Sequence, residues 1–178
     1  MKYVALLRGI NVGGNSKVDM KRLKSSLEEI GLKNVITYIN SGNVIFESEK
    51  PQTELDKLTE SAINKEFNLE VPVVIKSEDE LKKIAKIVPD EWTNDTDQKT
   101  DVLFLWEEVN DKNVLDDLHL KPEIDNVKYI DGAIIWNVKR KNVTRSSLLK
   151  IIGTPLYKKV TIRNINTVRK LNELINAL

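Results

Sequence analysis

The sequence predicts an α+β protein made of two tandem units, each with helices and an antiparallel sheet. Segments with strand or helix periodicity follow the order β-α-β-β-α-β-α over residues 1–88, and the same order returns over residues 101–178. Residues 89–100 between them are polar, acidic and without periodicity, which is typical of a linker. The two halves also match in register at particular positions, which favours a duplicated unit.

The first match is a strand that leads into a helix. Residues 75–77 are Ile-Lys-Ser and residues 162–164 are Ile-Arg-Asn, and in both the third residue can cap the next helix. The apolar helix positions then follow at the same spacing, as Leu81, Ile84 and Val88 and as Val168, Leu171 and Ile175. A split β-α-β pair repeated in this way predicts two ferredoxin-like units, each with an extra C-terminal helix.

The second match lies at two hairpin turns. Tyr38-Ile39 precede the first turn, and Tyr129-Ile130 precede the second. Side chains alternate between the faces of a sheet, so equivalent tyrosines should point to the same face of their respective sheets.

The first half contains a strand over residues 3–7, a glycine-rich loop and a helix that begins at its N-cap Asp19 and ends at Gly31. A hairpin follows, with a turn rich in asparagine, serine and glycine. The remaining elements are a helix over residues 53–67, a strand over 71–75 and a helix that opens with the capping box Ser77–Glu80. Pro72 indicates an edge strand or the start of a strand.

The second half repeats these elements with different turn chemistry. The predicted strands cover residues 102–106, 127–130, 133–136 and 160–162, and the predicted helices cover residues 111–118, 144–153 and a final segment capped by Asn164. Asp131-Gly132 is the two-residue turn of a tight hairpin.

The composition excludes several classes of protein. The chain has no cysteine, so it has neither a disulfide framework nor thiolate chemistry. It has one histidine, His119, which we interpret as a helix-end residue, and a zinc site is not expected. The apolar run at the start is too short for a signal peptide or a membrane span. We therefore expect a cytoplasmic protein with no metal, no cofactor and no membrane partner.

The formal net charge is only +1, but the charges are distributed unevenly. Residues 1–27 hold six Lys or Arg and one acid, and residues 139–170 hold ten Lys or Arg and no acid. This polarity favours a surface that faces an anion. The alternative is a basic tail that is simply solvated.

The two ends of the chain resemble a known family. The N-terminal motifs are LLRGINVGG and TYINSGNVIF, and the C-terminal motif comprises Thr161-Ile162-Arg163-Asn164, Thr167-Val168 and Lys170-Leu171. This pattern resembles the bacterial domain-of-unknown-function family 1697, so the resemblance implies a family and no activity. The sequence departs from the family pattern at Asn40, where the family has glutamine, and at Ile165, where it has tryptophan.

The glycine-rich loop is the first candidate ligand site. Glycines free the backbone to aim N–H groups at an anion, and the following helix N-terminus adds partial positive charge. The candidate residues are Arg8, Asn11, Gly13, Gly14 and Lys17. The spacing matches neither the phosphate-loop nor the dinucleotide pattern, Asp19 competes for the same N–H groups, and a tight crossover between strand and helix remains the alternative.

The first hairpin and the basic C-terminal part supply the other candidates. Tyr38, Asn40, Ser41 and Asn43 could donate or accept hydrogen bonds, although a turn needs the same residue types. If the first and third strands are the inner strands, this turn lies beside Arg8. The candidates of the C-terminal part are Arg145, Lys158, Lys159 and Arg163.

No set of residues forms a convincing catalytic group, so enzyme activity stays open. The sequence favours a protein that binds an anionic ligand, either nucleic acid or a nucleotide. One alternative is an enzyme that uses Arg8, Tyr38 and Asn40 on a small phosphorylated or carboxylated substrate. Another is a structural module that forms a homodimer through an open sheet face.

Overall fold

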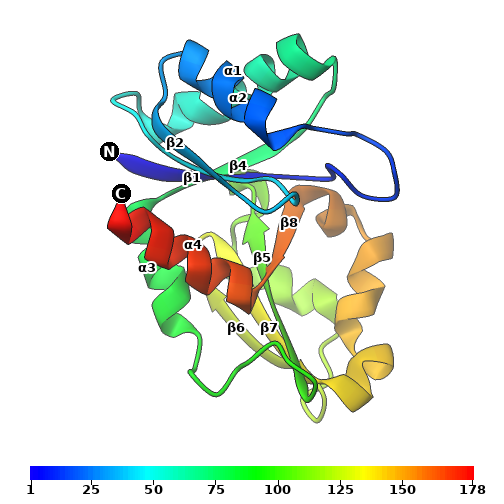
Figure 1. The fold of residues 1–178 in the computed structure, drawn as a ribbon. Coiled ribbons are helices and arrows are strands. Elements are labelled where there is room, and N and C mark those ends of the chain that lie inside the picture. Colours follow the sequence, from blue (N-terminus) through cyan, green and yellow to red (C-terminus); the bar gives the residue numbers. More distant parts are fainter. The chain divides into compact units, whose positions relative to one another are not determined.

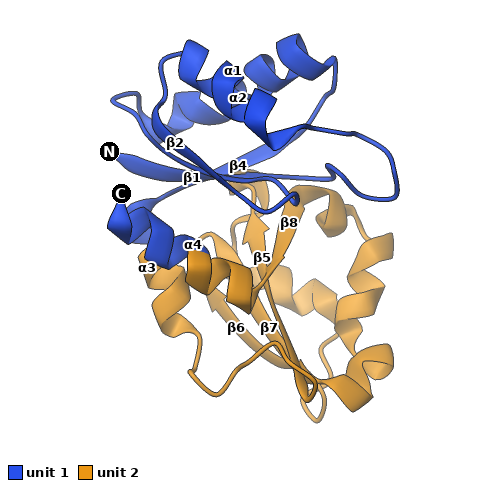
Figure 2. Ribbon diagram, in the orientation of Figure 1, with its two compact units in different colours: residues 1–81, 171–178 blue, residues 82–170 orange.

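The computed structural model describes residues 1–178 and contains two four-stranded antiparallel sheets with helices (Figure 1). The chain divides into two compact units, residues 1–81 with 171–178 and residues 82–170, and each holds one sheet (Figure 2). The division falls within α3 (Glu78–Ile87) and within α4 (Ile165–Ala177).

In the first unit the strands pair in the order β2-β3-β1-β4, so β1 and β3 are the inner strands, as the sequence predicted. These strands are β1 (Lys2–Leu7), β2 (Lys33–Tyr38), β3 (Asn43–Glu47) and β4 (Val73–Ser77). Helices α1 (Met20–Glu29) and α2 (Gln52–Phe67) lie side by side on one face of the sheet (Figure 1).

The core of this unit follows from strand alternation and helix spacing. Every second residue of β1 faces the helices, namely Tyr3, Ala5 and Leu7. These side chains form one buried cluster with α1 and α2 residues that include Leu23, Leu27, Leu55 and Ile63.

In the second unit the strands pair in the order β6-β7-β5-β8, which repeats the order of the first sheet. The strands are β5 (Gln98–Leu105), β6 (Asn126–Ile130), β7 (Ala133–Lys139) and β8 (Val160–Asn164). The buried cluster on one face of this sheet joins Leu103, Leu105, Ile134 and Trp136 to Leu148 and Ile151.

The predicted linker, residues 89–100, lies in the second unit and is held there by specific contacts. Arg169 Nη2 donates hydrogen bonds to the carbonyl oxygens of Pro89 at 3.2 Å and Trp92 at 3.3 Å. The Lys128 ammonium lies 5.5 Å from the centre of the Trp92 ring, within the range of a cation–π interaction.

Strand pairing and hydrogen bonding are the same at equivalent positions of the two sheets. Leu7 N donates to Gly42 O at 2.8 Å, and Leu105 N donates to Gly132 O at 3.0 Å. Ile75 lies opposite Ala5, and Ile162 lies opposite Leu103, the residue that has the same place in the second sheet.

The capped helices that follow these strands also correspond. Glu80 N donates to Ser77 Oγ at 3.3 Å and Ser77 N donates to Glu80 Oε2 at 2.8 Å, which completes the predicted capping box. Thr167 N donates to Asn164 Oδ1 at 3.0 Å. The six predicted apolar helix positions are all buried, so this sequence match is confirmed.

The predicted match between Tyr38 and Tyr129 is wrong. Tyr129 lies opposite Ile134 and packs against the buried cluster of its unit, whereas Tyr38 lies opposite Asn43, one position out of phase with the cluster residue Val44. The physical reason is the turn length. The first hairpin has four residues between Tyr38 and Asn43, whereas the second has two between Ile130 and Ala133.

The second half forms 3-10 helices where the sequence predicted α-helices over residues 111–118 and 144–153. Extended backbone at Ser146 and Thr154 separates three successive 3-10 helices, and Pro155 lacks the N–H that a continuing helix needs. Periods of 3.0 and 3.6 residues are nearly indistinguishable over such short segments. The 3-10 helices are η1 (Glu107–Val109), η2 (Lys112–Leu118), η3 (Arg140–Arg145), η4 (Ser147–Gly153) and η5 (Pro155–Lys159).

The second face of each sheet is buried as well as the first. Val4 and Leu6 of β1, and Val102 and Phe104 of β5, have no exposed surface. The expectation of an open sheet face, available for a homodimer, is therefore wrong. None of the helices combines the length and the apolar character that crossing a membrane requires.

Candidate functional site

The glycine-rich loop of the first unit is closed by the side chain of Asn11. Asn11 Oδ1 accepts a hydrogen bond from Val18 N at 2.9 Å, and Asn11 Nδ2 donates to Val18 O at 3.0 Å and to Asn40 O at 2.9 Å. This asparagine therefore joins the loop to the first hairpin turn. The predicted proximity of the two segments is confirmed.

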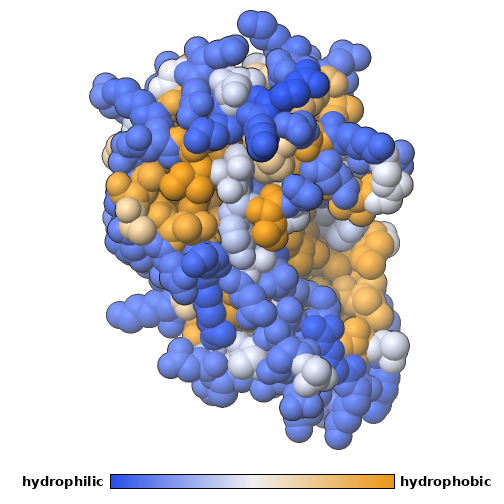
Figure 3. Space-filling model, in the orientation of Figure 1, coloured by the Kyte–Doolittle hydropathy of each residue, from blue (hydrophilic) through white to orange (hydrophobic).

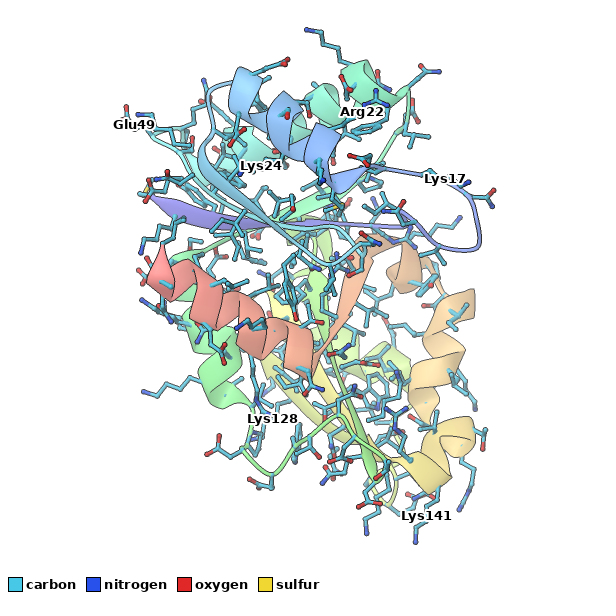
Figure 4. All side chains as sticks on the ribbon, viewed as in Figure 1. Lys17, Arg22, Lys24, Glu49, Lys128 and Lys141 are labelled. Carbon is cyan, nitrogen blue, oxygen red and sulfur yellow. The ribbon has the colours of Figure 1, made fainter.

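A surface hollow of about 480 Å³ lies beside this loop. Its lining comprises Asn11, Gly14, Lys17, Val18, Asp19, Met20 and Asn40, which include four of the predicted ligand residues. Figure 4 shows Lys17 on the loop that leads to α1. The Asp19 carboxylate accepts hydrogen bonds from Lys21 N at 3.0 Å and Arg22 N at 2.9 Å, so two N–H groups of the helix N-terminus already have a partner.

The other first-unit candidates do not line this hollow. Asn43 is fully buried, and its Nδ2 donates to Tyr38 O at 3.0 Å and to Ser41 Oγ at 3.1 Å, which stabilises the turn. Arg8 is half-buried, and its backbone N donates to Pro72 O at 2.9 Å. Gly13 is exposed at the tip of the loop.

Residues 139–159, which we term the basic segment, carry positive charge only. It contains seven Lys or Arg residues and no acid, and all seven side chains are exposed. They are Lys139, Arg140, Lys141, Arg145, Lys150, Lys158 and Lys159. The sequence named three of them as candidates, Arg145, Lys158 and Lys159, and counted the other four only in the overall charge.

Two of the seven side chains have partners outside the segment. Lys159 Nζ lies 2.6 Å from Glu108 Oε1, and Arg140 donates to Asp95 O at 2.9 Å and to Asn94 Oδ1 at 3.1 Å. The other five form no ion pair. The side chain of Lys141 extends away from the ribbon (Figure 4). The segment therefore presents mostly uncompensated positive charge.

Arg163 does not belong to this exposed set. Only 7% of the residue is exposed, and its Nη1 donates to Thr161 Oγ1 at 3.0 Å and to Ile162 O at 2.8 Å. Burial lowers the pKa of its guanidinium to about 10, so the side chain remains a cation at neutral pH. The equivalent residue of the first sheet, Lys76, is also buried and lies 3.5 Å from Glu80 Oε1.

A buried carboxylate fixes the start of η4, in the middle of the basic segment. Asp125 Oδ1 accepts hydrogen bonds from Ser146 Oγ at 2.5 Å and from Trp136 Nε1 at 3.2 Å, and Asp125 Oδ2 accepts from Ser147 N at 3.1 Å and Lys121 N at 3.0 Å. Burial raises the pKa of Asp125, but these hydrogen bonds outweigh burial, so its pKa lies below the ordinary value. The segment is thus tied to the core through one ionised side chain.

The remaining candidates for chemistry are structural. His119 is exposed at the left-handed end of η2, and its carbonyl oxygen accepts a hydrogen bond from Ser147 Oγ at 2.7 Å. No group of three or more histidine or carboxylate side chains has a geometry that could hold a metal ion.

Comparisons with known proteins identify relatives of the chain. A family model described as a protein of unknown function, DUF1697, matches residues 1–136. The solved structure of a conserved bacterial protein from Streptococcus pneumoniae matches with a TM-score of 0.85 and 27% sequence identity, over 98% of each chain. No curated protein sequence matches the chain at a significant level.

Proposed function

The chain belongs to the DUF1697 family of proteins of unknown function, and we propose that it binds nucleic acid through the basic segment. The observation that carries this proposal is the set of seven exposed cations in residues 139–159, with no acid among them. A polyanion neutralises such a surface and releases its own counterions, which favours binding. The proposal includes a cytoplasmic location, as we expect from the composition.

Electrostatic binding of this kind has a measurable signature. The logarithm of the affinity should fall linearly with the logarithm of the salt concentration, with a slope of about −0.7 to −0.9 per phosphate contact. Labelled single-stranded and double-stranded oligonucleotides, titrated with the full chain at several salt concentrations, would give this slope. Five phosphate contacts, one for each cation that has neither an ion pair nor a hydrogen-bond partner outside the segment, predict a slope of about −3.5 to −4.5.

A triple variant tests whether the segment is responsible. Replacing Arg145, Lys150 and Lys158 together by alanine should weaken binding and reduce the magnitude of the slope by about 2 to 3. The matched control replaces three exposed lysines outside the segment, Lys57, Lys65 and Lys86. Equal effects of the two variants would assign binding to net charge alone. If neither oligonucleotide binds with a Kd below about 100 μM at low salt, the proposal fails.

The hollow beside the glycine-rich loop favours a second candidate function, the binding of a small phosphorylated or carboxylated ligand such as a nucleotide. Its volume of about 480 Å³ lies within the range of small-molecule sites, and Lys17 and Asn40 supply polar groups, whereas the Asn11 amide already donates to Val18 O and Asn40 O. Arg8 and Tyr38, which the sequence placed in an enzyme site, are not part of this lining.

Calorimetry with inorganic phosphate and with a nucleoside monophosphate would test this second function. Lys17→Ala should abolish the heat of binding, whereas Lys21→Ala, which removes an equal charge from a residue outside the lining, should leave it unchanged. Binding that survives Lys17→Ala would exclude the hollow as the site.

The finer description of the fold is also a proposal. We infer that the two halves, residues 1–88 and 101–178, are ferredoxin-like units that arose by duplication. The repeated strand order supports this. So do the equivalent hydrogen bonds that Gly42 O and Gly132 O accept in their respective sheets. If the halves, expressed separately, gave sheets with different strand order, the inference would be wrong.

A further inference from the structure

Residues 147–153 expose apolar side chains among the cations. A 3-10 helix has three residues per turn, so residues three apart lie on one ridge. In η4 one ridge carries Leu148 and Ile151, which are buried in the core, and the next carries Leu149 and Ile152, which are 43% and 57% exposed.

This exposed pair is unusual for the molecule. Only five large hydrophobic residues are classed as exposed in the whole chain, and two of them form this ridge. In Figure 3, hydrophobic surface appears among hydrophilic neighbours over the part of the molecule where Figure 1 draws the basic segment. Lys150 lies between the two apolar residues in sequence, and Arg145 and Lys158 lie on the adjoining turns.

We propose that the basic segment is built for single-stranded nucleic acid, with its cations on the phosphates and the Leu149–Ile152 ridge against unpaired bases. This inference rests on the proposed function and names the substrate class. A duplex turns its phosphates outward and keeps its base faces stacked inside, so an apolar ridge gains nothing from it. A single strand offers base faces and phosphates together, which apolar and cationic side chains can contact at the same time.

An anionic lipid surface is the competing polyanion. Stable attachment of an amphipathic segment to a membrane requires a broad apolar face in addition to basic residues. Here the exposed apolar ridge has two side chains against seven cations, so the charge dominates the surface. These proportions favour a partner that is recognised mainly through its charge, and nucleic acid fits better than lipid.

The test separates the apolar contribution from the electrostatic one. The full chain is titrated with a labelled single-stranded RNA without self-complementarity, with the same strand annealed to its complement, and with vesicles that contain phosphatidylglycerol. The variant is Leu149→Ser with Ile152→Ser, and the control is Val12→Ser, another exposed apolar residue outside the segment. Circular dichroism and thermal unfolding establish that each variant is folded.

We expect the single strand to bind more tightly than the duplex at equal salt. The double variant should weaken single-strand binding about tenfold, because it removes apolar contact area, and should leave duplex binding unchanged. The salt slope should stay the same, since no cation is removed. Val12→Ser should have no effect on any of the three ligands.

Each other outcome has a distinct meaning. Equal affinity for strand and duplex, with no effect of the double variant, would overturn this inference and leave the proposed function in place. No binding to either nucleic acid would overturn the proposed function itself. Binding to the vesicles alone would overturn both, and would identify the segment as a membrane-surface element.

Discussion

A β-carbon added to Gly42 would lie 2.7 Å from the β-carbon of Leu7, a distance that real side chains do not adopt. The two residues are held together because Leu7 N donates to Gly42 O at 2.8 Å. Gly42 also has a φ of +84°, in the region that side chains disfavour. The first hairpin therefore approaches the end of β1 at a position that only glycine fits.

We predict that Gly42→Ala lowers the free energy of unfolding by about 2–4 kcal/mol, since backbone strain adds to overpacking against Leu7. Gly14→Ala is the matched control, because Gly14 has a φ of +81° and no atom near its added β-carbon. That variant should lose only about 1–2 kcal/mol, from the strain alone. Urea unfolding measures both, and equal losses would mean that the contact with Leu7 adds nothing.

The sequence predicted this fold best where local chemistry decides the structure. The cap at Ser77, the cap at Asn164 and the apolar spacing that follows each of them depend on neighbouring residues only, and all are present. The register of a hairpin depends on the backbone of its turn. Ile39 adopts a φ of +50°, which is unusual for a β-branched residue, so residue types alone did not indicate the longer turn.

The two helix caps provide the second prediction. Ser77→Ala and Asn164→Ala should each lower the free energy of unfolding by about 1 kcal/mol, because each leaves a helix N–H without its side-chain acceptor. Ser25→Ala is the control, since Ser25 is exposed within α1 and caps no helix. A loss at Ser77 with none at Asn164 would show that the two caps are equivalent in geometry but not in energy.

Tyr129 and Tyr38 provide the third prediction. Tyr129 Oη donates to Asn110 Oδ1 at 3.0 Å, and the same oxygen accepts from Gly132 N at 2.7 Å, so the tyrosine supports the turn of the second hairpin. Tyr129→Phe should lower the free energy of unfolding by about 1 kcal/mol, the usual effect of losing one hydrogen bond. Tyr38→Phe should change the free energy of unfolding little. Chemical denaturation of the two variants measures both losses, and a larger loss for Tyr38→Phe than for Tyr129→Phe would contradict the prediction.

The candidate site was predictable in part. The overall charge count pointed to residues 139–170, but it could not separate exposed cations from buried ones. Arg163 follows a strand pattern that puts it on a buried sheet face, and the equivalent Lys76 is buried in the same way. The exposed apolar ridge at Leu149 and Ile152 was not predicted, because Leu148 and Ile151 have the same spacing and the sequence does not show which of the two pairs faces the core.

Asp125 provides the last prediction, which concerns pH. Its pKa lies below the ordinary value in the folded protein, because hydrogen bonds from Ser146, Lys121 N, Ser147 N and Trp136 outweigh the effect of burial. Above the ordinary carboxyl pKa of about 3.9, both the folded and the unfolded chain carry the ionised group, and its stabilising effect is complete. As the pH falls below this value, the unfolded chain takes up a proton first. The stabilisation therefore decreases and is lost as the pH passes through the folded pKa.

Asp125→Asn removes this charge and should lower the free energy of unfolding at neutral pH by about 2–3 kcal/mol, since it weakens hydrogen bonds to a buried charged acceptor. The difference from the unmodified chain should begin to shrink below about pH 4, where the unfolded chain takes up a proton, and should be smallest below the lower pKa of the folded protein. Asp116→Asn, at an exposed residue of η2, is the control and should show no difference at either pH. Urea unfolding at neutral and acid pH measures the effect. If the difference in unfolding free energy stays constant into the acid range, the charge of Asp125 does not contribute to holding the basic segment.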